Sequence, residues 1–141
     1  MAVRISIAEI INEIPKIQQK ADKVAWLQKH DTPALRVILK YTYDNTVEFL
    51  IPNTPPPWKK NEYEDEAKSL LYRESRRLKI FIKGGGYDNL NQIKRESLFI
   101  SLLEDVDNED AEILCTMISK KAFKGLTKKA VQEAFPDLIE E

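Results

Sequence analysis

Cysteine and histidine are nearly absent from this sequence of 141 residues, because Cys115 and His30 are the only residues of their kinds. One cysteine excludes an intramolecular disulfide and a cysteine-rich zinc site. One histidine leaves few ligands for a transition-metal centre and few bases for nucleophilic catalysis. We therefore expect no metal or other cofactor. We interpret His30 as a cap at a helix C-terminus and Cys115 as a small buried hydrophobic residue.

Long hydrophobic runs and a secretion signal are also absent. No apolar run approaches the roughly 18 residues that a membrane-spanning helix requires. The N-terminal residues, MAVRISIAEIINEIPK, lack an uninterrupted apolar stretch and a cleavage site. These absences predict a soluble, cytoplasmic protein with no membrane partner.

Neither sign of charge is in excess, since 22 lysine and arginine residues face 23 aspartate and glutamate residues and give a net charge of −1. This balance excludes a protein that packs nucleic acid through bulk positive charge. The charge is nevertheless uneven: residues 1–83 carry 15 basic and 11 acidic residues, whereas residues 84–141 carry 7 and 12. A dipolar surface of this kind can still present one positive face to DNA.

Proline and glycine interrupt the chain at two places. Four of the seven prolines fall within residues 44–61, which we expect to form an extended loop or arm. Residues 46–51 alternate in polarity and fit a strand or part of that arm.

Glycines 84–86 mark a second break. The remaining patterns predict an all-α fold, a single domain over residues 1–141 with six or seven helices.

The expected helices are bounded by local signals. The first expected helix begins at a capping box over residues 6–9 and ends near Pro15, the second follows Asp22, and the third has Thr32 as its N-cap and Pro33 at its first position. Two longer helices are expected over residues 64–82 and 91–104. Another is capped by Asn108, and the last runs from Thr127 to Pro136. Residues expected to face the core include Val24, Ala25, Trp26, Leu27, Leu35, Ile38, Leu39, Thr42, Ala67, Leu70, Leu71, Leu78, Phe81, Ile93, Phe99, Leu102 and Leu103.

Two segments come closest to a catalytic or ligand-binding motif. The acidic run at 104–110 lacks the central glycine of an EF-hand loop, so we interpret it as a solvent-exposed turn with acids at a helix N-terminus. Lys83 precedes the three glycines, whereas a P-loop places its lysine after them, so the glycines are interpreted as a helix cap and turn. We therefore expect a protein that is not an enzyme.

A lysine-rich segment, KKAFKGLTKK at 120–129, contains no acid. Its lysines are Lys120, Lys121, Lys124, Lys128 and Lys129. The last two follow the helix cap Thr127, where positive charge opposes the helix dipole and a phosphate would relieve the repulsion. Gly125 would let a phosphate backbone approach closely. A loop that only aids solubility explains the same residues, and both interpretations stay open.

A second basic cluster contains Arg73, Arg76, Arg77, Lys79 and Lys83, which can share one helical face and match phosphate geometry. Pairing with Glu66, Glu74 or a neighbouring helix is the slightly preferred interpretation. Trp58 follows three prolines and precedes two lysines. Its ring would either stack on a base or partner surface, or cover the core.

The two ends of the chain resemble a known family. Residues 7–52, IAEIINEIPKIQQKADKVAWLQKHDTPALRVILKYTYDNTVEFLIP, resemble the start of the N-terminal DNA-binding domain of ATP-dependent DNA ligases, particularly those of T4-like phages. Residues 110–139, DAEILCTMISKKAFKGLTKKAVQEAFPDLI, resemble the closing helical hairpin of that domain. The resemblance implies an all-helical module that binds duplex DNA by contacting the DNA backbone. Carried over by position, Lys120, Lys121, Gly125, Thr127, Lys128 and Lys129 would be the contacting residues.

The sequence departs from those ligases in its chemistry. Ligase catalysis needs a lysine nucleophile in a K-x-D-G motif, and the nearest string here, residues 29–32, lacks the glycine. The resemblance therefore implies a non-catalytic, phage-encoded protein in the host cytoplasm, accessory to DNA replication or repair. The alternative is a protein-interaction or virion component that reuses the fold, partnered by a phage replication or virion protein. That alternative rests on the near-zero net charge, the acidic residues 104–112 and the proline–tryptophan arm.

Overall fold

The protein folds as a single all-α domain. The computed structural model describes residues 6–54, 56–59 and 71–139. These contain seven α-helices and two 3₁₀ helices, η1 and η2. Their bounds are α1 Ile7–Glu13, η1 Ile14–Lys16, α2 Lys20–Lys29, α3 Pro33–Tyr43, α4 Leu71–Glu74, η2 Ser75–Phe81, α5 Gln92–Asp105, α6 Asn108–Ile118 and α7 Lys128–Ala134. The expected all-α fold of six or seven helices is confirmed.

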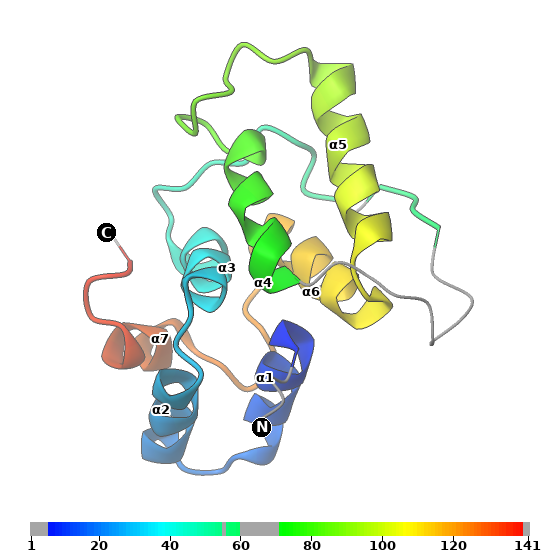
Figure 1. Ribbon diagram of the computed structural model, residues 1–141. Coiled ribbons are helices and arrows are strands. Elements are labelled where there is room, and N and C mark those ends of the chain that lie inside the picture. The colour runs from blue at the N-terminus through cyan, green and yellow to red at the C-terminus, as the bar shows by residue number, and fades with distance from the viewer. Residues whose placement is uncertain (1–5, 55, 60–70, 140–141) are drawn as a thin grey trace.

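The helices surround a central pair, α3 and α6, which pack against each other. Figure 1 shows α1, α2 and α7 on one side of this pair, and α5 with the 83–91 loop on the other. Helix α7 packs mainly on α2, whereas α6 packs on α3, α5 and α1. The two helices of the closing segment 110–139 are thus held by different neighbours. None of the helices in the described ranges is long and apolar enough to cross a membrane.

Three helix starts follow from side-chain caps that the sequence predicts. The hydroxyls of Ser6, Thr32 and Thr127 accept hydrogen bonds from backbone N–H groups three residues later, at 3.1, 3.3 and 3.2 Å. Each bond satisfies a donor that the first helical turn leaves unpaired. Two boundaries differ slightly from expectation: α2 begins at Lys20, before Asp22, and Asp107 is the N-cap of α6.

The long helix expected over residues 64–82 is wrong for the part that can be assessed. Residues 71–81 form one α-helical turn followed by the 3₁₀ helix η2. The buried residues of η2 are Ser75, Leu78 and Phe81, spaced by three. That spacing matches the three residues per turn of a 3₁₀ helix, which aligns every third side chain on the core. Ala67 and Leu70, expected on the same helix, lie outside the described residues.

The core contains most of the predicted residues. Leu27, Leu35, Ile38 and Leu39 are fully buried, and the rings of Phe81 and Phe99 meet edge to face at 5.1 Å. Two predictions were wrong, because Ala25 is exposed and Ile93 is 77% exposed. Helix α5 turns Phe99, Leu102 and Leu103 inward instead.

The proline-rich segment is irregular where the structure describes it, as expected. In place of a strand, residues 46–51 contribute one isolated bridge between Phe49 and Ile82. Leu50 N–H donates to the Phe81 carbonyl at 2.7 Å, and Lys83 N–H donates to the Glu48 carbonyl at 2.8 Å. These bonds hold the segment against the end of η2.

Candidate nucleic-acid interface

The lysine-rich turn between α6 and α7 is anchored on the end of α3. Phe123 and Leu126 are buried in the core. The Tyr43 hydroxyl accepts a hydrogen bond from Phe123 N–H at 2.9 Å and donates one to the Leu126 carbonyl at 2.7 Å. Burial raises the pKa of Tyr43 to about 12, so the hydroxyl keeps its proton at neutral pH. The turn is therefore held at two points by one side chain.

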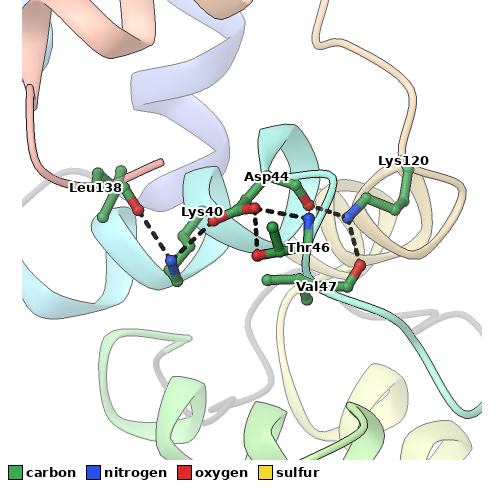
Figure 2. Close-up of polar contacts among 6 residues, drawn as sticks. All are labelled: Lys40, Asp44, Thr46, Val47, Lys120 and Leu138. Carbon is green, nitrogen blue, oxygen red and sulfur yellow. Dashed lines mark hydrogen bonds and ion pairs between the residues drawn. The ribbon is translucent and has the colours of Figure 1, made fainter. Parts of the chain in front are cut away.

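Lys120 does not belong to an exposed interface, contrary to prediction. Its ammonium donates to the backbone carbonyls of Asp44 and Val47 at 2.5 and 2.8 Å, as Figure 2 shows. Burial lowers the pKa of Lys120, although the Asp44 carboxylate opposes that shift. Lys120 also has a positive φ of 55°, a conformation that costs a non-glycine residue free energy. It is a structural tie between the turn and the chain that follows α3.

The same network includes the fully buried Asp44. Its carboxylate accepts hydrogen bonds from Lys40 Nζ at 2.9 Å, from Thr46 N–H at 2.8 Å and from the Thr46 hydroxyl at 2.6 Å. Lys40 also donates to the Leu138 carbonyl at 3.0 Å, which ties the chain beyond α7 to α3 (Figure 2). A buried carboxylate with several hydrogen bonds is stabilised against the cost of its burial.

Gly125 is exposed, but the side on which a side chain would project faces Pro15. Its φ is +77°, and a Cβ built there would lie 2.8 Å from the Cα of Pro15. The glycine therefore permits a close approach to η1, and the predicted approach of a phosphate backbone to its exposed side stays a prediction. The Gly125 carbonyl accepts a hydrogen bond from Lys23 Nζ at 2.6 Å. Lys23, on α2, thus joins the turn although the sequence separates the two residues by 102 positions.

Lysines remain at the surface of the turn. Lys121, Lys124 and Lys129 are exposed and Lys128 is half-buried. Thr127, also predicted to contact DNA, uses its hydroxyl to cap α7. With Lys23, the structure gathers five lysines around residues 120–129, and we call Lys23, Lys121, Lys124, Lys128 and Lys129 the lysine surface.

Acidic residues border the lysine surface. Lys121 and Lys124 line a hollow of about 350 Å³ between α1 and α6, and Glu109 and Glu112 line the same hollow. Near α7, Lys20 pairs with Glu133 at 2.7 Å. The positive surface is therefore bounded by negative charge, which lowers the potential that a polyanion would meet.

The arginine cluster lies on α4 and η2, away from the lysine-rich turn. Arg77 donates to the carboxylates of Glu74 at 2.9 Å and Asp105 at 3.3 Å, and these hydrogen bonds raise its pKa. The ion-pair interpretation is confirmed for Arg77, whose positive charge is already neutralised. Lys83 lies 3.9 Å from Glu48 in an exposed pair, and Arg73, Arg76 and Lys79 are exposed. Glu66, the other predicted partner, lies outside the described residues.

Trp58 packs against the hydrophobic core and is half-buried. The backbone N–H of the next residue, Lys59, donates to the Glu104 carboxylate at 2.8 Å. This arrangement supports the interpretation in which the ring covers the core, and it leaves less of the ring for stacking on a base.

Asp110 is a residue whose role the sequence analysis missed. The acidic run was expected to be solvent-exposed, but the Asp110 side chain is buried and accepts a hydrogen bond from Ala8 N–H at 2.9 Å. Burial raises its pKa to about 6, with smaller contributions from Asp107, Glu109 and Glu9. Asp110 therefore satisfies a free N–H in the first turn of α1 from a helix 102 residues away.

His30 is the C-cap of α2, as expected, and its backbone N–H bonds the last carbonyls of the helix. The His30 ring packs edge to face on Trp26 at 4.3 Å, and its buried Nε2 makes no hydrogen bond to any residue that the structure describes, so the ring does not add to the cap through that atom. Burial lowers its pKa, which favours the neutral ring at pH 7. Cys115 is only partly buried. Among the residues that the structure describes, no three histidine, cysteine, aspartate or glutamate side chains are grouped to hold a metal ion.

Comparison with known proteins gives one match. No curated protein matches this sequence. A family of unknown function (DUF6433) matches residues 10–124, a stretch that begins inside α1 and ends in the lysine-rich turn. Because the match covers most of the chain, the protein belongs to the DUF6433 family.

Proposed function

We propose that this protein is a non-catalytic module that binds the backbone of duplex DNA without base specificity, through the lysine surface. The observation that supports this function is the gathering of five lysines around a turn that contains no acid and is fixed to α3 by Tyr43. Lysine ammonium groups bind phosphates as point charges and carry little sequence information.

The anchored turn favours binding because the backbone is ordered before DNA arrives. Only the lysine side chains then lose conformational freedom, at about 0.5–1.5 kcal/mol for each side chain that is immobilised. Lys23 is already oriented by its bond to the Gly125 carbonyl. We assign no DNA contact to Lys120, whose ammonium donates to two backbone carbonyls, or to Arg77, whose guanidinium pairs with two carboxylates. Lys23 makes one such bond, and its ammonium has three donors, so it can still contact a phosphate.

The bordering acids and the net charge of −1 predict weak binding that depends strongly on salt. If four or five phosphates are neutralised, the logarithm of the association constant should fall with the logarithm of salt concentration at a slope of about −4. The resemblance to ligase DNA-binding domains supports duplex over single-stranded DNA and a role accessory to phage DNA replication or repair, within the host cytoplasm.

The test is fluorescence anisotropy on labelled intact duplex, nicked duplex and single-stranded DNA, from about 20 to 200 mM salt. The test variant replaces Lys121, Lys124 and Lys129 by glutamate, three exposed residues of the lysine surface.

The matched control replaces Lys29, Lys59 and Lys94 by glutamate, three residues that are also exposed but lie outside the lysine surface and the arginine cluster, and it changes the net charge equally. We expect the test variant to lose duplex binding at the lowest salt and the control to retain most of it. Equal losses in the two variants would mean that only net charge matters, and an unchanged test variant would refute the proposed interface.

A further inference from the structure

A small hollow separates helix α5 from the proline-rich segment. Its volume is about 200 Å³, and its walls include Pro52, Pro56, Pro57 and Phe99. Among the described residues that line it, Glu96, on α5, is the charged one. A hollow with apolar walls and a single carboxylate favours a long side chain with an apolar stem and a positive end.

Ile93 extends this surface beyond the hollow. It lies three residues before Glu96 on α5, so the two side chains are neighbours on one helical face. Ile93 is 77% exposed, which is unusual for a large aliphatic residue that has a hydrophobic hollow beside it. Single exposed apolar residues are common, but an apolar residue that adjoins such a hollow enlarges the area a partner can cover.

A buried arginine fixes the start of α5 to the chain that precedes it. Arg95 is 3% exposed and donates to Gln92 Oε1 at 2.6 Å, to the Tyr87 carbonyl at 2.8 Å and to the Ile80 carbonyl at 3.3 Å. Gln92 in turn donates to the Leu50 carbonyl at 2.9 Å, which joins the start of α5 to the proline-rich segment. A preorganised surface loses little entropy when a partner binds.

Glu96 has no hydrogen bond or ion pair within residues 6–54, 56–59 and 71–139. The residue is half-buried beside the apolar walls of the hollow. A cation that reached it there would gain more than at a fully solvated site.

We propose that this surface docks a protein segment that presents a lysine or arginine side chain next to an apolar residue. The stem of the basic side chain packs against the prolines, its charged end pairs with Glu96, and the apolar neighbour covers Ile93. The commitment to a basic segment comes from charge complementarity with Glu96. This surface belongs to α5 and the proline-rich segment, whereas the lysine surface belongs to α2, α7 and the turn. Peptide docking and DNA binding are therefore tested independently.

The experiment selects binders to the intact protein from a phage-displayed library of random 12-residue peptides. We expect enriched peptides to carry a lysine or arginine beside a large apolar residue. A synthetic copy of an enriched peptide is then titrated against the protein by fluorescence anisotropy. Failure to enrich any peptide, or enrichment of peptides without a basic residue, would overturn the proposal.

Three variants decide whether the enriched peptide uses the proposed surface. Glu96→Lys should weaken its binding at least tenfold, and Ile93→Ser should weaken it several-fold. Glu109→Lys, an equal charge reversal at an exposed residue of α6, should leave binding unchanged. All three sites are at the surface, and circular dichroism checks that each variant is folded. Equal effects of the two charge reversals would show general electrostatic attraction and would also overturn the proposal.

Discussion

The buried carboxyl of Asp110 makes the stability of the protein depend on pH in an unusual direction. In the folded protein burial raises its pKa to about 6, from an ordinary value of 3.8. Below about pH 3 the carboxyl is mostly neutral in both the folded and the unfolded chain. As the pH rises towards 6, the unfolded chain releases its proton first, so the free energy of unfolding decreases. Above about pH 7 the loss is complete.

The magnitude follows from the difference of about two pKa units. Each unit corresponds to about 1.4 kcal/mol, so Asp110 should remove about 2–3 kcal/mol of stability between pH 4 and pH 7.5. The charges that oppose its ionisation are Asp107 and Glu109 on α6 and Glu9 on α1. The Ala8 N–H favours ionisation, but its contribution is smaller than that of burial.

Substitution of Asp110 by Asn isolates this effect, because the amide oxygen can still accept the hydrogen bond from Ala8 and carries no charge. Urea unfolding of both proteins at pH 4.0, 5.0, 6.5 and 7.5 gives the difference in unfolding free energy. We expect Asp110→Asn to gain about 2–3 kcal/mol relative to the wild type between the lowest and the highest pH. A difference that stays constant, or that changes in favour of the wild type as the pH rises, would refute the reasoning. The second result would mean that the α1 N-terminus stabilises the ionised carboxylate more than burial destabilises it.

Three further substitutions test how the lysine-rich turn is held, each by urea unfolding at pH 7. Gly125→Ala should lower the free energy of unfolding by about 2–4 kcal/mol, because its Cβ would collide with the η1 backbone at a positive φ. Gly84→Ala, at a similar φ but in open space, should cost only about 1 kcal/mol, and equal losses would contradict the collision. Lys120→Met should lose about 1–3 kcal/mol by leaving two carbonyls without a donor, whereas Lys121→Met should stay within about 0.5 kcal/mol of the wild type. Tyr43→Phe removes the hydroxyl that holds the turn at two points and should cost about 1–3 kcal/mol, with the pH 7 circular dichroism spectrum unchanged.

Local features of the fold were predictable because their causes are close in sequence. Ser6, Thr32 and Thr127 cap helices through residues three positions away, so their roles can be read from short motifs. The 3₁₀ helix η2 was missed because spacings of three and four are mixed over residues 64–82. Only the run of three-residue spacings at 75, 78 and 81 could have indicated it.

The candidate site was less predictable, because its residues depend on distant partners. Lys120 resembles Lys121 in sequence, but its position over the carbonyls of the chain after α3 makes it structural. The space that a side chain on Gly125 would need is taken by Pro15, which is 110 residues away along the chain. Asp110 cannot be told from its acidic neighbours until α1 is placed beside α6. In each case the tertiary arrangement, and not the local pattern, decides whether a charged or flexible residue is available to a ligand.

The hydrogen bond between Thr46 N–H and the buried Asp44 carboxylate has a consequence for local motion. Residues 44–47 have no regular secondary structure, and amides in such segments normally exchange with solvent deuterium early. Here the acceptor is also bonded by Lys40, while Lys120 holds the same segment from the opposite side, as Figure 2 shows. The Thr46 amide is therefore bonded to a carboxylate whose position is fixed on both sides, although Thr46 itself is exposed. In a hydrogen–deuterium exchange experiment the Thr46 amide should exchange later than amides of irregular segments that lack such a partner.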